Sequence, residues 1–443
     1  MNLPGSAVAA RTAHPAAGDV GTASRIDAVG LLTIYLFLVM ALPSALVFAP
    51  LGAAGGPATL FAVALMICYL MMRLHPSFHL DTGPQPVRVA GVLFLCSILA
   101  AYVSGNRQFM PTAELNGADR GIISAVGWLG VMVVAADGID SADRLKSLLN
   151  RIVTGATALA LVGILQFFAG LNVTKYVVIP GLTFNQPPSD LITRGGFDRP
   201  TATTAQPLEF AALMVMVLPI AIHQARFAPA GLRGRRWLKV AVIGAAIPMT
   251  VSRTALAGLA ITALVLLPTW PTQHRRRAYA ALLATGAALL VAVPQLLGTF
   301  ITLVAQITGG SASTDSRTTA ISEALPYIAR HPWFGTGFGT FLPQVYFFTD
   351  DQYLSSLITT GAVGLFSLGV LFATGWLVAR SLRRRSADAE VRDLAQSLAA
   401  AIAVAAGCFG TFDVLGFAVA AGLTAILIGC AGAAFRLSGV AEI

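Results

Sequence analysis

Long apolar segments recur along almost the whole chain, and they constrain its fold more than any other feature. They lie near residues 28–48, 57–72, 88–104, 121–136, 150–170, 207–225, 238–250, 254–269, 278–297, 353–379, 394–410 and 414–435. A helix of roughly 20 apolar residues crosses a bilayer, and such segments are longer than the strands of membrane barrels. Only 11% of the residues are charged, whereas soluble domains average about 25%. We therefore expect an all-α polytopic membrane protein with about twelve transmembrane helices.

Basic residues are distributed unevenly between the loops, and this asymmetry predicts the orientation of the helices. Short cytoplasmic loops of membrane proteins collect Lys and Arg. Placing both termini in the cytoplasm puts most of the 29 basic residues on the inner side. The net charge of +9 therefore reflects membrane orientation, and we expect membrane lipids but no nucleic acid among the partners.

Loop lengths divide the chain into two tails and one membrane domain. Residues 1–27 are rich in Ala and Gly and are expected to form a mobile cytoplasmic tail. Residues 28–436 are expected to form a single transmembrane domain, followed by a cytoplasmic tail at 437–443. Long outer loops are predicted at 171–206 and 298–352, and function concentrates in such loops.

The region between Arg236 and Arg275 has an arginine-rich run at each end, and such runs indicate the cytoplasmic side. The chain between them must therefore cross the membrane twice. Two short helices fit this length, with a tight turn at 250–253. This hairpin places Arg253 at the outer surface, at the tip of the turn.

The loop 298–352 contains a predicted amphipathic helix near 318–330, which Ser316 would cap. The apolar residues that recur on one face of this helix are Ile321, Leu325 and Ile328. A glycine-rich stretch follows at 331–340. No strand precedes it and no Lys follows it, so it predicts a close-packed turn rather than a nucleotide site.

Three arginines on the outer side, where basic residues are few, are candidate ligands for an anion. Arg199 precedes the segment 207–225, Arg253 lies in the predicted turn, and Arg317 lies near the start of the loop helix. A guanidinium group binds phosphate oxygens bidentately and stays charged. Each arginine alone is also explained by pairing with a lipid head group or a nearby carboxylate. The three together favour a shared phosphate or pyrophosphate site.

Candidate acid–base groups are Asp350, Asp351 and His331. A carboxylate whose pKa is raised by a like charge and by low dielectric can act as a general base. Either aspartate would equally cap the following helix, and His331 would equally cap the preceding one. No spacing of His, Asp, Glu or Cys predicts a metal site. The cysteines lie in apolar segments and predict no disulfide framework: Cys68, Cys96, Cys408 and Cys430.

The order of these features resembles the O-antigen ligase and O-antigen polymerase superfamily of bacterial polysaccharide enzymes. The resemblance covers roughly residues 190–380, and the topology extends it over the chain. Three stretches carry it: the Arg199 segment leading into a membrane span, the Ser252-Arg253 hairpin, and the stretch from Arg317 through His331–Phe341 and Asp351-Gln352-Tyr353-Leu354 to Gly361–Leu365.

The resemblance implies a helical fold like the C-type membrane glycosyltransferases, with a large extracytoplasmic loop over a cleft. It implies transfer of a glycan from a polyprenyl pyrophosphate carrier to a glycan or lipid-glycan acceptor, without a metal or other cofactor. The reaction would occur at the outer face of the bacterial cytoplasmic membrane, and both polymerase and ligase activities fit. Arg199, Arg253 and Arg317 would match the arginines that hold the donor pyrophosphate.

The chain departs from the ligases at one position that matters for catalysis. The ligases have a His where this chain has Asp350 or Asp351. A carboxylate would then replace imidazole as the base, or the base would be His331, Asp198 or Glu209.

Two other classes of function fit a polytopic membrane protein. A transporter or flippase of an envelope precursor would favour ionisable residues near the bilayer midplane and internal repeats, and the sequence shows few of the former and no repeat. A non-catalytic scaffold is the third class, and no motif specifically favours it.

Overall fold

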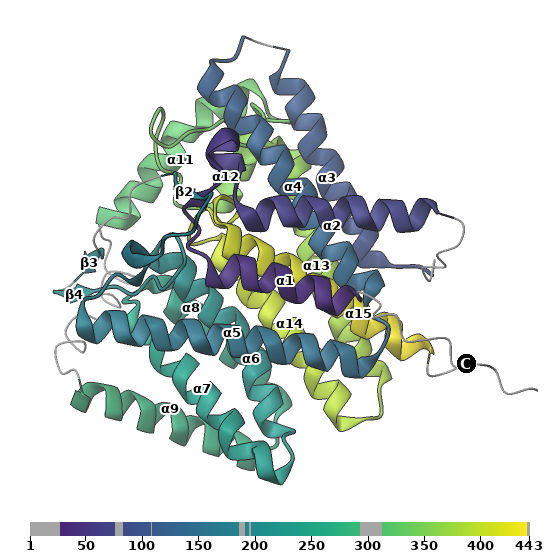
Figure 1. Ribbon diagram of the computed structural model, residues 1–443, viewed down its shortest axis with the longest axis vertical. Coiled ribbons are helices and arrows are strands. Elements are labelled where there is room, and N and C mark those ends of the chain that lie inside the picture. The colour runs from purple at the N-terminus through teal and green to yellow at the C-terminus, as the bar shows by residue number, and fades with distance from the viewer. Residues whose placement is uncertain are drawn as a thin grey trace, which may run out of the picture.

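The computed structural model describes residues 27–75, 83–107, 109–185, 191–194, 196–292 and 312–440. Helices make up most of this part of the chain (Figure 1). They are α1 (Ala28–Ala41), α2 (Pro57–Leu74), α3 (Pro86–Gly105), α4 (Thr112–Gly138), α5 (Ala142–Ala169), α6 (Pro207–Arg226), α7 (Arg233–Met249), α8 (Arg253–Leu266), α9 (Thr272–Ala292), α11 (Ala312–Arg330), α12 (Gln352–Thr359), α13 (Gly361–Arg385), α14 (Ala389–Phe409) and α15 (Ala418–Val440). Four strands of two residues form two antiparallel pairs, β1 (Leu46–Val47) with β2 (Thr183–Phe184) and β3 (Thr193–Arg194) with β4 (Phe197–Asp198).

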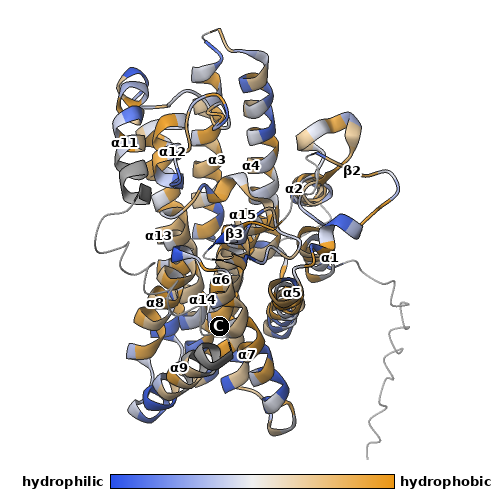
Figure 2. Cartoon of the chain, turned by 90° about the vertical axis from the view of Figure 1, so that its left-hand side faces the viewer, coloured by the Kyte–Doolittle hydropathy of each residue, from blue (hydrophilic) through white to orange (hydrophobic). Residues whose placement is uncertain are grey.

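Eight of the described helices are long and apolar enough to cross a membrane: α2, α3, α4, α5, α6, α13, α14 and α15. Two shorter apolar helices are Ala28–Ala41 and Arg253–Thr269. Figure 2 shows mostly hydrophobic residues along α8 and α14 and hydrophilic residues mainly towards helix ends. The all-α polytopic membrane class is therefore confirmed. The number of about twelve crossings stays a prediction, because α7 and α9 begin with arginine-rich turns and belong to neither group.

The helix ends gather at two opposite ends of the bundle. At one end, Lys146 near the start of α5 forms an ion pair of 2.8 Å with Glu390 near the start of α14. At the other end, the amide of Ser44 after α1 donates a hydrogen bond of 3.0 Å to the carbonyl of Thr203 before α6. We name the first the basic end, after the nearby run 383–385, and the second the loop end. In Figure 1 the end of α15 lies on one side of the molecule, and α11, β3 and β4 lie on the other.

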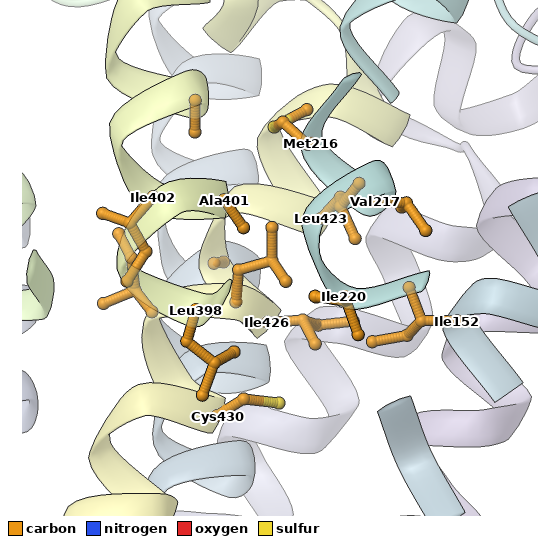
Figure 3. Close-up of a cluster of buried hydrophobic side chains, with 14 of the residues drawn as sticks. Ile152, Met216, Val217, Ile220, Leu398, Ala401, Ile402, Leu423, Ile426 and Cys430 are labelled. Atoms are coloured by element: carbon orange, nitrogen blue, oxygen red, sulfur yellow. The ribbon is translucent and has the colours of Figure 1, made fainter. Parts of the chain in front are cut away.

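The centre of the bundle is formed by α6, α14 and α15. Helix α6 is buried along nearly its whole length, with Phe210 and Ile220 both 0% exposed. A helix that is apolar on all sides belongs in the interior of a bundle. Figure 3 shows the contact region, where α6 and its neighbours contribute Ile152, Met216, Val217, Ile220, Leu398, Ala401, Ile402, Leu423, Ile426 and Cys430.

The predicted single helix over 353–379 is wrong, because the structure divides it into α12 and α13 at Thr360. The first residue of α13, Gly361, has a φ of +65°, and a Cβ there would lie 2.4 Å from the carbonyl carbon of Trp333. The amide of Val363 donates a hydrogen bond of 3.1 Å to the Trp333 carbonyl. The break therefore exists because the loop after α11 inserts its backbone against the start of α13.

The glycine-rich stretch forms the close-packed turn that the sequence predicts. Gly335, Gly337 and Gly339 have φ values of +65°, +113° and +83°. A Cβ on Gly335 would lie 2.3 Å from the carbonyl carbon of Thr359, and one on Gly339 would lie 2.4 Å from the carbonyl oxygen of Gly117. Only glycine fits such contacts. The stretch therefore joins the loop after α11 to α4 and α12.

Helix α1 is shorter than the apolar segment 28–48 that predicts it. It ends at Ala41, and Pro43 follows. Because proline disfavours helical backbone in the residue before it, the chain leaves the helix there and forms β1 instead. The apolar residues after Ala41 therefore reach the loop strands rather than extending the helix.

Helix α11 confirms the predicted loop helix but differs from it in two details. It begins at Ala312, so Ser316 lies within the helix and is not its cap. The buried residues are Ala320 and Ala324, whereas Ile321 and Leu325 are 51% and 58% exposed. Small residues let helices approach closely, and α11 therefore packs through its alanines and leaves the larger apolar side chains outside.

Candidate active site

Arg199 is buried at the loop end and is only 7% exposed. Its Nε donates a hydrogen bond of 2.8 Å to the carbonyl oxygen of Thr250. Its Nη2 is buried and has no hydrogen-bond acceptor among the described residues. Burial, with Arg194 as a second cause, lowers the pKa of Arg199 to about 10, so the group is still charged at neutral pH. A buried charged nitrogen without an acceptor is costly, and an anionic ligand would remove that cost.

The turn at 250–253 lies between α7 and α8, as the sequence predicts. The amide of Thr250 donates a hydrogen bond of 3.2 Å to the carbonyl of Ile247, and Val251 has a φ of +45°. Arg253 is the first residue of α8. Since Arg199 binds the carbonyl of Thr250, the structure brings the backbone that carries Arg253 next to the side chain of Arg199.

Asp351 caps helix α12. Its Oδ1 accepts a hydrogen bond of 2.8 Å from the amide of Tyr353, which confirms the capping interpretation for this residue. Asp350 is exposed and has a φ of +49°. The two adjacent carboxylates therefore differ, because Asp351 accepts a backbone hydrogen bond whereas Asp350 faces solvent.

Strained backbone is concentrated in these same segments. In the described part of the chain, the residues other than glycine with positive φ are Ala202, Val251 and Asp350. They lie close in sequence to Arg199, Arg253 and Asp351. Such conformations cost about 1–3 kcal/mol each and cluster at functional sites, which agrees with a site built from these loops.

Asp413 is a further carboxylate at the loop end, and no sequence motif indicates it. Its Oδ2 accepts a hydrogen bond of 2.9 Å from Thr349, and its Oδ1 is buried without a donor among the described residues. Burial raises the pKa of Asp413 to about 6, the hydroxyls of Thr349 and Ser355 partly oppose this rise, and the charges of Asp350 and Asp351 add to it. A carboxyl group with this pKa is suited to accept a proton near neutral pH. The sequence signal for it was an acidic residue in the short turn before α15.

Direct hydrogen bonds connect these turns with one another. The hydroxyl of Thr254 donates to that of Thr411 at 2.9 Å and so joins the α7–α8 turn to the α14–α15 turn. The amide of Leu415 donates to Oε1 of Gln352 at 2.8 Å and joins the same turn to the start of α12. These contacts place the segments of five candidate residues in one contiguous region, which we name the loop-end site: Arg199, Arg253, Asp350, Asp351 and Asp413.

Glu209 is fully buried and holds the adjacent backbone in place. Its Oε1 accepts hydrogen bonds from the amides of Val419 at 2.8 Å and Ala420 at 3.2 Å, in the first turn of α15. Its Oε2 accepts one of 2.8 Å from the amide of Ala205. A carboxylate is favourable at a helix N-terminus. Glu209 therefore binds the loop that follows Arg199 to α15, and both of its oxygens are occupied.

His331 lies next to the other end of α12. The adjacent Pro332 accepts a hydrogen bond of 2.9 Å from the amide of Ala362, at the start of α13. Asp351 lies before α12, whose eight residues span about 12 Å at about 1.5 Å per residue. The structure therefore separates the backbone of His331 from that of Asp350 and Asp351.

The remaining candidates are Arg317 and Asp198. Arg317 lies in α11, and its side chain falls outside the described residues, so its approach to Arg199 and Arg253 stays a prediction. Asp198 lies in β4, immediately before Arg199. Groups of three or more His, Cys, Asp or Glu residues that could hold a metal ion are absent from the residues that the structure describes.

Comparison with known protein families identifies part of the chain. Residues 238–369 match the model of a family described as O-antigen ligase. Over this segment, the match supports the resemblance to the O-antigen ligase superfamily. The matched segment contains Arg253, Arg317, His331, Asp350 and Asp351. A search of curated proteins finds no match.

The O-antigen ligase match supports ligase-type glycan transfer in cell-envelope synthesis, and so a glycosyltransferase-like activity. It implies lipid-linked glycan substrates. Together with the apolar helices it indicates a bacterial membrane protein. Arg199 and Asp413 lie outside the matched segment, and the fold brings their segments to it.

Proposed function

We propose that this chain transfers a glycan from a polyprenyl pyrophosphate carrier to an acceptor hydroxyl at the outer face of the bacterial cytoplasmic membrane. The observation that carries this proposal is the buried Nη2 of Arg199, which lacks an acceptor among the described residues. A diphosphate supplies the negative oxygens that such a nitrogen requires. Burial also distinguishes Arg199 from an arginine that reaches out to lipid head groups.

The reaction requires one bond to form and one to break. The acceptor oxygen attacks the anomeric carbon of the donor sugar, the bond from that carbon to the pyrophosphate oxygen breaks, and the acceptor proton passes to a base. Negative charge grows on the departing pyrophosphate. Arg199, Arg253 and Arg317 would therefore stabilise the transition state more than the ground state. No step of this route requires a nucleotide, a metal or another cofactor.

The base in this proposal is one of the carboxylates of the loop-end site. Asp413 is the first choice, because its buried Oδ1 has no donor among the described residues and its pKa is raised to about 6. Asp351 already accepts a backbone hydrogen bond, and Asp350 is exposed. His331 is the remaining candidate, from the far end of α12.

Glycan profiling of a deletion strain tests the proposal and separates its two forms. Single repeat units that accumulate on the carrier indicate a polymerase, and long chains without an acceptor indicate a ligase. Unchanged glycans contradict both forms, whereas donor trapped on the inner face favours the alternative of a transporter or flippase. A flippase moves the carrier across the membrane without breaking its bond to the glycan, so its loss traps donor on the inner face.

Complementation of that strain tests the site itself. We expect the Arg253→Ala variant to reach the membrane in normal amounts but not to restore the glycan product in the deletion strain. Arg120→Ala, which removes an exposed arginine from α4, is the matched control and should restore the product fully. Full activity of Arg253→Ala would contradict the proposed role of the turn in donor binding.

A further inference from the structure

A groove at the basic end of the bundle carries an unusual concentration of positive charge. Its volume is about 330 Å³, and it is lined by Trp376, Leu377, Arg380, Ser381, Arg384 and Arg385. A single water needs only about 10–15 Å³ of such volume. The groove is therefore large enough for a polyatomic group, and its lining contains three guanidinium groups and no carboxylate.

The spacing of the arginines along α13 leaves their charges uncompensated. Arg380 and Arg384 are four residues apart and lie on the same face of the helix, where like charges repel. Over the described ranges of the chain, no carboxylate oxygen lies within 4.0 Å of a side-chain nitrogen of Arg380, Arg384 or Arg385. An anion in the groove would offset this repulsion, because it would attract each of the three arginines.

Two of the arginines are held in position by other contacts. Arg380 donates a hydrogen bond of 2.8 Å to Oε1 of Gln396, and its guanidinium carbon lies 5.5 Å from the ring centre of Trp376. Its Nε is buried and has no acceptor among the residues that the structure describes. The guanidinium carbon of Arg385 lies 5.5 Å from the ring centre of Phe435. Side chains that are already ordered lose less freedom when a ligand binds.

The apolar part of the groove points to a lipid rather than a soluble anion. Leu377 is 57% exposed and Trp376 is 36% exposed, on a helix that is apolar and long enough to cross a membrane. Tryptophan is enriched where the acyl region of a bilayer meets the head groups. The charged and apolar parts of the groove thus have the same order along α13 as the head group and acyl chain of a phospholipid.

We propose that this groove binds a phospholipid with an anionic head group. Its phosphodiester would contact Arg380 and Arg384, and an acyl chain would follow Leu377 and Trp376. Basic pockets beside transmembrane helices recognise anionic lipid head groups on the cytoplasmic side. The groove and the loop-end site lie at opposite ends of the bundle, so this site does not depend on the proposed transferase activity.

Quenching of Trp376 by brominated lipids tests the site directly. The full chain is reconstituted in vesicles that contain brominated phosphatidylglycerol or brominated phosphatidylcholine at equal mole fractions. The difference in quenching between the wild type and Trp376→Phe isolates the signal of this tryptophan. We expect stronger quenching by phosphatidylglycerol, and equal quenching by the two lipids would overturn the proposal.

Paired variants separate a specific site from general surface charge. The double variant Arg380→Gln, Arg384→Gln should raise the mole fraction of phosphatidylglycerol needed for half-maximal quenching, by roughly fivefold for each arginine removed. Arg233→Gln with Arg235→Gln removes two exposed arginines from α7 and should leave that value unchanged. An equal loss in both double variants would show that surface charge alone attracts the lipid.

A competition experiment distinguishes the lipid from a soluble phosphate. Inorganic phosphate is added at constant ionic strength to vesicles that contain brominated phosphatidylglycerol. Quenching of Trp376 should stay unchanged, because an acyl chain holds the lipid in the groove. Complete reversal by inorganic phosphate would assign the groove to a soluble anion and would contradict the lipid site.

Discussion

The Nε of Arg199 donates a hydrogen bond of 2.8 Å to the carbonyl oxygen of Thr250, 51 positions along the chain. This contact connects the loop before α6 to the turn between α7 and α8. The contact holds the guanidinium group in place through Nε. The buried Nη2 has no hydrogen-bond acceptor among the described residues. The fold therefore holds Arg199 through one nitrogen, and Nη2 is the nitrogen that we propose binds an anion.

Substitution of Arg199 should strongly reduce the rate of catalysis without preventing folding. We expect Arg199→Ala to lower the rate of glycan transfer by about 10²–10³, the usual cost of removing one transition-state hydrogen-bond donor. Arg199→Lys should recover little of the lost rate, because an ammonium group lacks the rigid, forked set of donors with which a guanidinium group can bind Thr250 and a phosphate together. The rate is measured in proteoliposomes with a lipid-linked donor. A wild-type rate for Arg199→Lys would show that charge alone is sufficient.

Asp413→Asn should stabilise the protein at neutral pH. The folded-state pKa of about 6 lies above the ordinary value of 3.8, so the folded protein binds the proton more tightly than the unfolded chain does. Ionisation of Asp413 therefore lowers the free energy of unfolding as pH rises through about 6, by at most about 3 kcal/mol. The variant should have the higher melting temperature in detergent at pH 7–8 and no advantage below about pH 4.

The same substitution should inactivate the enzyme if Asp413 is the base. The wild type should then lose activity as pH falls through about 6, whereas an ordinary aspartate would lose it near pH 4. The exposed Glu323 provides a control, because Glu323→Gln should change neither stability nor rate. An active Asp413→Asn enzyme with an unchanged pH profile would assign the proton transfer to Asp350, Asp351 or His331.

Glu209→Ala should destabilise the bundle rather than affect catalysis alone. The substitution leaves the amides of Ala205, Val419 and Ala420 without their carboxylate acceptor in a fully buried position. Each buried donor left without a partner costs about 1–3 kcal/mol. We expect a lower melting temperature and less protein in the membrane. A variant that unfolds like the wild type would show that water replaces the carboxylate.

Gly335→Ala should disrupt the glycine-rich turn. The new Cβ would lie 2.3 Å from the carbonyl carbon of Thr359, at a backbone φ of +65°. Both the contact and the conformation oppose a side chain, so we expect a loss of at least about 1–3 kcal/mol in stability. In Gly369→Ala, within α13, the Cβ meets no atom within 4 Å, and a small gain of about 0.5–1 kcal/mol is expected. Equal stability of the two variants would contradict this packing.

The sequence identified the elements that depend on local patterns. Apolar length located a helix at each apolar segment, including the two helices on either side of the turn at 250–253. Helix formation in lipid depends mainly on hydropathy and on hydrogen bonding within the backbone. The glycine-rich turn and the capping role of Asp351 were also predicted, because positive φ and helix caps depend on single residue types. The break at Thr360 was missed, because it arises from contact with a distant loop.

The sequence by itself determined a polytopic helical membrane protein with candidate arginines and carboxylates in or near the connections between its helices. Only the tertiary structure decided which of them lie close together. It brings the segments of Arg199, Arg253 and Asp351 next to that of Asp413, and it separates the backbone of His331 from that of Asp351. The physical reason is that burial and hydrogen bonding depend on neighbours distant in sequence. The fold brings together turns from separate parts of the chain, and these turns bury the side chains of Arg199 and Asp413. Their burial leaves Nη2 of Arg199 without an acceptor among the described residues and raises the pKa of Asp413.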